Sequence, residues 1–176
     1  MGTIKTTNIE PIADNGTVTL GSSGDTFALA SGVTQTIAVN TPTFFANLSS
    51  NQNISNDTQT KIVFDSEQFD VGNVYNPSTA RYTPAYAGKS YITTTIRSAT
   101  GTDFNTFQMK FKKNGSELAI VAARNENNDS IVLSGVFTHD ADDYFEVFIY
   151  QESGGTIAIN GGSVFVTFFS AYKIIE

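Results

Sequence analysis

The stretch FQMKFKKNGSELAIVAA, residues 107–123, predicts a β-hairpin. Phe107, Met109 and Phe111 alternate with polar residues, so these three side chains point to one face of a strand. Asn114-Gly115 follows, a pair that accepts the positive φ angles of the tight turns joining antiparallel strands. The apolar run 118–123 then supplies the returning strand. We therefore expect an antiparallel pair whose apolar face lies in a protein core.

Short strands separated by turns run through most of the remaining chain, and helical periodicity is almost absent. Gly, Asn and Asp cluster between the apolar runs, where tight turns need them. About eight strands at roughly 8–14-residue spacing, without a helix, are typical of a β-sandwich or jelly roll. Besides the hairpin, we expect strands at residues 60–64, 90–97, 130–137, 144–150, 156–159 and 164–172.

The composition agrees with one all-β domain in a chain of 176 residues. Thr, Ser and Asn make up close to a third of the residues, and every aromatic residue is Phe or Tyr. β-Branched and aromatic residues suit a pleated, half-buried surface. Because no apolar stretch is long enough to span a bilayer and the start has no export signal, we expect no membrane insertion.

Several classes of function are excluded by what the chain lacks. It has no cysteine, which excludes disulfides, cysteine zinc sites and thiol nucleophiles. Its one histidine, His139, excludes most Ser-His-Asp chemistry and multi-histidine metal sites. The net charge of −7 argues against a nucleic-acid partner. Without a Gly-x-Ser-x-Gly elbow or a recognisable carboxylate pair, we expect no enzymatic activity.

Two zones differ in composition, residues 1–43 and residues 44–176. In the first zone, residues 16–20 (GTVTL) are echoed by residues 24–29 (GDTFAL), each long enough for one short strand and a turn. Two such units cannot bury a face alone. We therefore expect an N-terminal docking segment and short β shaft shared by several copies of the chain, with an unstructured tail as the alternative. The second zone is the expected jelly-roll head.

The run FDSEQFDVGNVYNPSTARYTP at residues 64–84, followed by Gly88 and Tyr91, resembles the opening of the complement one-q type globular domain. That family combines an acidic and aromatic first strand, a Tyr-Asn segment and a Thr-Pro segment ahead of a glycine and a tyrosine. The segments 143–147 (DYFEV) and 168–172 (FFSAY) also fit the family. The resemblance covers residues 60–173.

This resemblance implies a jelly roll of the tumour necrosis factor-like superfamily, packed as a homotrimer. Residues 8–16 (NIEPIADNG) resemble segments of the fibre and appendage proteins of tailed bacteriophages. The animal heads sit on collagen stalks, whereas this chain has no Gly-X-Y repeat. Together the two resemblances imply a virion protein assembled in the bacterial cytoplasm. Its N-terminus would dock on another tail, baseplate or capsid protein.

A further argument for association comes from the strand expected at residues 144–150. Val147 and Ile149 alternate with Phe148 and Tyr150, so both faces of this strand are apolar. A strand that is apolar on both faces must be covered on both faces. We therefore expect copies of the chain to pack about an axis in a closed, symmetric assembly.

The expected receptor surface consists of loops at the end of the head distal to the N-terminal segment. Alternate turns of an antiparallel sandwich lie at opposite ends, and the superfamily resemblance implies that the stalk and the C-terminus share one end. Polar, exposed loops suit contacts with a host glycan or protein. The candidate contact residues are Asn73, Tyr75, Lys113, Asn114, Ser116, His139, Asp140 and Asn160.

Asp140, Asp142 and Asp143 form a candidate calcium site, because Ca²⁺ prefers carboxylate oxygens. The family resemblance implies calcium at the apex of the trimer. The run lacks the Asp-x-Asp-x-Asp-Gly spacing of a dedicated calcium loop, so a solvated acidic turn is the alternative. We expect no other cofactor.

These observations predict a trimeric phage tail fibre or spike whose head domain contacts the host surface. One alternative is a structural adapter, or a tip or capsid decoration protein, that binds no receptor. The other is a bacterial glycan-binding, lectin-like trimer outside any virus.

Overall fold

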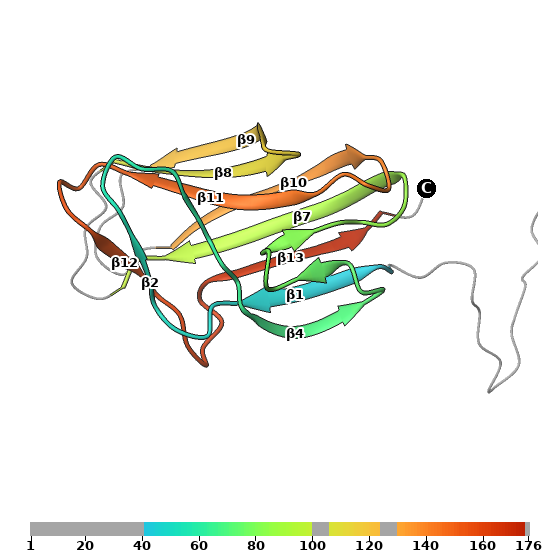
Figure 1. The fold of residues 1–176 in the computed structure, drawn as a ribbon, viewed down its shortest axis with the longest axis horizontal. Coiled ribbons are helices and arrows are strands. Elements are labelled where there is room, and N and C mark those ends of the chain that lie inside the picture. Colours follow the sequence, from blue (N-terminus) through green and yellow to red (C-terminus); the bar gives the residue numbers. More distant parts are fainter. Residues whose placement is uncertain (1–40, 100–105, 124–129, 175–176) are drawn as a thin grey trace, which may run out of the picture. The chain divides into compact units, whose positions relative to one another are not determined.

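The hairpin expected at residues 107–123 forms in the structure, a computed structural model that describes residues 41–99, 106–123 and 130–174 (Figure 1). Asn114 and Gly115 have φ angles of 52° and 81°, as an Asn-Gly turn between strands requires. Phe107, Met109 and Phe111 are fully buried. The prediction of this hairpin and of its inner face is confirmed.

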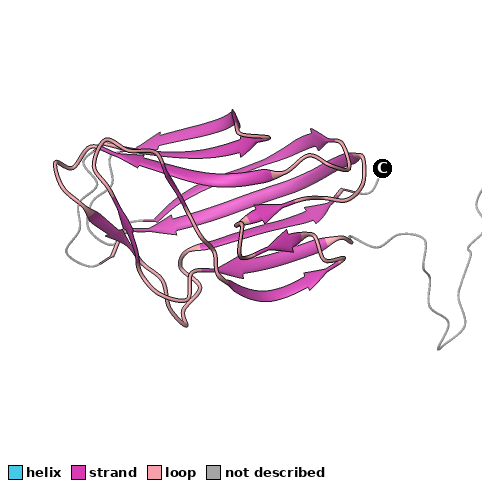
Figure 2. Cartoon of the chain, in the orientation of Figure 1, coloured by secondary structure: helices cyan, strands magenta, loops and turns pink. Residues whose placement is uncertain are grey.

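Thirteen β-strands and no helix make up the regular structure of the described residues (Figure 2). The expected all-β fold is therefore confirmed, and those residues contain no helix that could span a membrane. The strands are β1 (Thr43–Asn47), β2 (Gln52–Ile54), β3 (Thr60–Lys61), β4 (Ser66–Val71), β5 (Tyr75–Asn76), β6 (Arg81–Tyr82), β7 (Gly88–Arg97), β8 (Phe107–Lys113), β9 (Ser116–Ala123), β10 (Ser130–His139), β11 (Phe145–Gln151), β12 (Ile157–Ile159) and β13 (Phe168–Lys173).

Two antiparallel sheets face each other across the core. One has the strand order β10-β7-β13-β1-β4, and the other has the order β5-β6-β11-β8-β9, with β3 also pairing with β11. The neighbours β1 and β13 come from opposite ends of the described chain, and they pair Phe45 with Ser170. Such long-range pairing, instead of a simple succession of hairpins, makes the fold a jelly roll.

Aromatic side chains fill the space between the two sheets. Phe44 stacks on Tyr75 with ring centroids 4.6 Å apart, and it meets the edge of Phe169 at 5.0 Å. Burying one large apolar side chain contributes about 1.5–3 kcal/mol, so this core holds the sheets together without disulfides. The fully buried rings are Phe44, Phe64, Tyr82, Phe107, Phe111, Phe145 and Phe169.

The chain divides into two units, Met1–Ala38 and Val39–Glu176. The expected shaft at residues 1–43 lies outside the described residues as far as residue 40, and β1 begins at Thr43. The described chain begins at Thr41-Pro42, where the Lys173 N–H donates to the Pro42 carbonyl at 3.1 Å. We call this end of the jelly roll the Pro42 end, and the other the opposite end.

Candidate functional site

Most of the expected receptor residues lie at the Pro42 end. Strand β7 begins there, because Ser90 pairs with Lys173 and Gly88 pairs with His139 at the end of β10. Each connection reverses the direction of the chain, so the β8–β9 and β10–β11 turns return to that same end. The expected distal position is therefore wrong for Asn73, Tyr75, Lys113, Asn114, Ser116, His139 and Asp140.

Asn160 alone among these candidates lies at the opposite end. Its N–H donates to the Arg97 carbonyl at 2.8 Å, just beyond β12. A recess of about 360 Å³ is lined there by Asn160, Ser163, Val164 and Arg97. Val164 is 71% exposed, so this loop combines polar and apolar groups at the surface.

His139 is buried, with 2% of its surface exposed, so the expectation of an accessible contact residue is wrong. Its Nδ1 donates to the Tyr86 carbonyl at 3.1 Å, and its Nε2 lies 2.9 Å from Ser90 Oγ. The hydroxyls of Tyr82 and Tyr86 lie 2.7 and 2.8 Å from the same Ser90 Oγ. Burial lowers the pKa of His139 and outweighs its hydrogen bonds to the backbone. His139 is thus part of an internal polar network that ties β10 to β7.

Asp143 closes the turn between β10 and β11 by accepting three hydrogen bonds. The donors are Lys113 Nζ at 2.7 Å, Asn114 Nδ2 at 2.6 Å and the Asp140 N–H at 2.8 Å. The Lys113 hydrogen bond is the largest of the effects that lower the pKa of Asp143 to about 2. Lys113 and Asn114 therefore hold a neighbouring turn in place.

The three expected calcium ligands do not converge. Both Asp143 oxygens accept hydrogen bonds from protein groups, while Asp140 and Asp142 are exposed. In residues 41–99, 106–123 and 130–174, no three acidic or histidine side chains are placed to share a metal ion.

Tyr75 faces the core, and is therefore not a surface contact. It is 4% exposed, and its hydroxyl donates to the Phe64 carbonyl at 2.8 Å. The turn before it is held by Asp70, which accepts from the N–H groups of Val74 and Tyr75 at 3.0 and 2.8 Å. Asn73 is exposed in this turn with a φ angle of 55°.

The outer surface of the sheet β10-β7-β13-β1-β4 carries an aromatic cluster that we call the aromatic face. Phe45 lies at its centre, 5.0 Å from Phe168, 5.5 Å from Phe165 and 6.2 Å from Phe69, measured between ring centroids. Phe69 and Phe165 are each 47% exposed. The rings of the aromatic face are Phe45, Phe69, Tyr91, Phe165, Phe168 and Tyr172.

Among the described residues, no charged side chain belongs to the three central rows of this surface. Three successive rows of paired residues cross all five strands, and every member is apolar, aromatic or a neutral polar residue. The central row pairs Ser134, Thr93, Ser170, Phe45 and Phe69. The row on one side of it consists of Val136, Tyr91, Tyr172, Thr43 and Val71. The row on the other side consists of Val132, Thr95, Phe168, Asn47 and Ser66.

The apolar side chains expected on the outer side of β11, Phe148 and Tyr150, are half-buried and have partners within the chain. Lys112 Nζ lies 4.2 Å above the Phe148 ring, and the Tyr150 hydroxyl donates to Glu152 at 2.8 Å. The association expected from this strand stays a prediction. A usable signal lay elsewhere in the sequence: Phe44-Phe45 and Phe168-Phe169 are adjacent pairs, and neighbours on a strand point to opposite faces.

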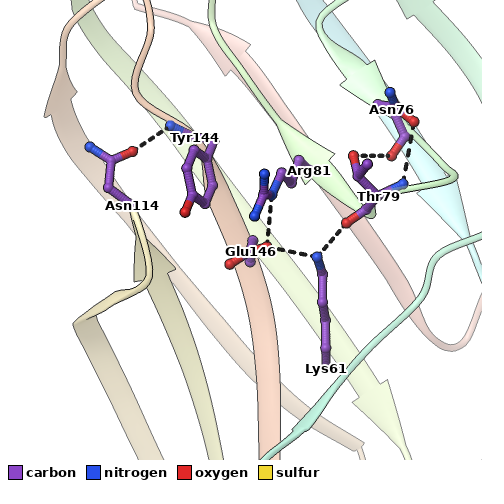
Figure 3. A network of polar contacts seen from close by, with 7 residues as sticks. All are labelled: Lys61, Asn76, Thr79, Arg81, Asn114, Tyr144 and Glu146. Atoms are coloured by element: carbon purple, nitrogen blue, oxygen red, sulfur yellow. Dashed lines mark hydrogen bonds and ion pairs between the residues drawn. The ribbon is translucent and has the colours of Figure 1, made fainter.

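On the outer face of the other sheet, Glu146 holds two cations (Figure 3). Its Oε1 accepts from Lys61 Nζ at 2.6 Å and from Arg81 Nε at 2.9 Å, and the carboxylate is almost fully buried. Burial alone raises the pKa of Glu146, but the two hydrogen bonds outweigh it and lower the pKa. The Arg81 guanidinium also stacks 3.9 Å from the Tyr144 ring centroid. Sequence analysis missed this cluster, because its members are far apart in the chain.

Comparisons with solved structures identify the class of fold. Murine APRIL matches with a TM-score of 0.59 and 13% identity over 75% of this chain and 98% of that one. The Eiger TNF of S. frugiperda matches with a TM-score of 0.55 and 13% identity over 76% of this chain and 91% of that one. The globular domain of zebrafish complement 1qA protein matches with a TM-score of 0.54 and 16% identity over 77% of this chain and 98% of that one.

These similarities confirm a jelly roll of the tumour necrosis factor and complement 1q type, as the sequence resemblance predicted. At such low identity they define the fold alone. No protein-family model and no curated protein sequence matches the chain.

Proposed function

We propose that this chain is a non-catalytic binding protein that works as a homotrimer, with copies packed through the aromatic face. The observation that carries the proposal is the uncharged surface that crosses five strands and exposes the rings of Phe69, Phe165 and Tyr172. Isolated exposed apolar residues are ordinary, whereas a contiguous apolar patch marks an interaction site. A second copy is the fitting occupant, because the resemblance to complement one-q heads implies a threefold assembly.

The sequence resemblance to phage appendages supports the finer proposal of a tail fibre or spike that contacts the host surface. Because the described chain begins at the Pro42 end, the loops farthest from that point are those of the opposite end. We assign the receptor contact to this end, where the recess beside Asn160 and Val164 offers polar and apolar groups together. The two alternatives, a structural adapter or decoration protein and a bacterial lectin, imply the same trimer.

Sedimentation of the full chain at micromolar concentration tests the trimer, with an expected mass three times 18.9 kDa. Phe69→Lys places a charge on the aromatic face and should give monomers. Ile120→Lys is the matched control, because Ile120 on β9 is 50% exposed compared with 47% for Phe69. A folded monomer from the unmodified chain would overturn the proposal.

Infection assays separate the finer alternatives. A virion protein should be found in purified phage particles, and a bacterial lectin should not. If the head contacts a receptor, added soluble protein should block infection, and Asn160→Ala should weaken that block. Unchanged infection in the presence of saturating protein would favour an adapter or decoration role.

A further inference from the structure

A second recess lies beside the β5–β6 hairpin. Its volume is about 340 Å³, near the lower limit for sites that enclose small ligands. Most of its lining is polar: Arg81, Glu67, Asn73, Asn76 and Thr83. A polar recess of this size fits one sugar residue better than an apolar ligand.

Arg81 is held in a fixed orientation at the edge of this recess. Its Nε is bound to Glu146, one side of the guanidinium stacks on Tyr144, and Asn76 lies opposite it on the paired strand β5 (Figure 3). Within the described part of the chain, neither Nη group of Arg81 makes a hydrogen bond. A pre-oriented pair of N–H donors matches the two oxygens of a carboxylate.

The ion-pair cluster that holds Arg81 is positive, although the whole chain has a net charge of −7. Glu146 is one carboxylate shared by two cations, Lys61 and Arg81. These three side chains together keep one positive charge, and the Arg81 guanidinium is the member that lines the recess. A positive group at the edge of a recess attracts an anionic group.

The other polar residues of the recess suit hydroxyl groups. Glu67 has an exposed carboxylate, which repels any anion close to it but accepts hydrogen bonds from hydroxyl groups. The amides of Asn73 and Asn76 supply further donors and acceptors. Asn76 Oδ1 caps the turn at Ser78 and Thr79, while its Nδ2 makes no hydrogen bond within the described residues.

We propose that this recess binds a carboxylate-bearing sugar, such as a uronic acid residue of an acidic polysaccharide. The sugar carboxylate pairs with the Nη groups of Arg81, and its hydroxyls bond to Glu67, Asn73 and Asn76. None of the lining residues belongs to the aromatic face, so sugar binding and trimer formation are measured separately.

Calorimetric titration of the full chain with trigalacturonic acid tests this assignment. Removing a hydrogen bond to a charged group costs about 1.5–3 kcal/mol, so Arg81→Gln should weaken binding at least about tenfold. Arg81→Lys should fail to restore it, because a lysine lacks the two-pronged geometry. Lys89→Gln, which removes a positive charge from the other sheet, is the control and should bind like the unmodified chain.

Asn73→Gly provides a test that does not disturb the Glu146 cluster. Glycine keeps the positive φ of 55° at this position but removes the amide, so binding should weaken while the melting temperature stays close to that of the unmodified chain. Absence of trigalacturonate binding by the folded protein would overturn the proposal. So would equal binding of neutral maltotriose, or full competition by inorganic phosphate. Sedimentation of the same samples reports the trimer separately.

Discussion

Glu146→Gln is the sharpest test of the polar cluster on the outer sheet, because it keeps the shape of the side chain and removes its charge. Glu146 accepts hydrogen bonds from Lys61 at 2.6 Å and from Arg81 at 2.9 Å. Each hydrogen bond to a charged group is worth about 1.5–3 kcal/mol. The two cations keep 27% and 42% of their side-chain surface exposed, so water compensates part of the loss.

We therefore expect Glu146→Gln to lower the free energy of unfolding by about 2 kcal/mol, because one buried carboxylate serves two partners. For a chain of this size, that corresponds to a fall in melting temperature of about 4–8 °C. The assay is calorimetric unfolding, at one fixed protein concentration because self-association shifts the melting temperature.

Glu152→Gln is the matched control, since Glu152 is a solvent-exposed carboxylate that contacts only the Tyr150 hydroxyl among the described residues. Its effect should stay within about 0.5 kcal/mol, as for ordinary surface substitutions. If Glu146→Gln is equally mild, the two ion pairs contribute nothing measurable and the reasoning is refuted.

Two further predictions concern pH and backbone packing. The folded state lowers the pKa of His139 below its unfolded value of about 6.5, so the contribution of His139 to stability should be full above that pH and fall as the pH drops below it. Urea unfolding midpoints between about pH 8 and 5 measure this fall. His139→Gln should flatten the dependence of the midpoint on pH in that window. An unchanged slope in that variant would show that other groups are responsible. A Cβ at Gly161 would lie 2.1 Å from the Ser50 carbonyl oxygen, so Gly161→Ala should lower the free energy of unfolding in urea by about 1–3 kcal/mol. A Cβ at Gly155 meets nothing within 4 Å, so Gly155→Ala should leave the free energy of unfolding nearly unchanged. Equal stability of the two variants would contradict the packing at the opposite end.

The receptor surface shows how sequence reasoning fails over longer distances. Strand alternation and turn chemistry located the β8–β9 hairpin correctly, but assigning its turn to one end of the head required the direction of β7. That direction depends on its pairing with β13, whose partners lie far away in the chain. The His139 prediction failed for a related reason, since the Ser90 and Tyr86 groups that bury it are 49 and 53 residues away.

The amino-acid sequence alone determined the all-β class, the hairpin at residues 107–123 and the side chains that face its core, because alternation and turn preferences act between near neighbours. The sequence also contains the adjacent aromatic pairs Phe44-Phe45 and Phe168-Phe169, whose members point to opposite faces of their strands. Only the tertiary structure decided which aromatic surface stays uncovered, which loops share an end, and that Glu146 meets Lys61 and Arg81. Those contacts join residues 65 and 85 positions apart, and only the pairing of strands distant in sequence brings them together.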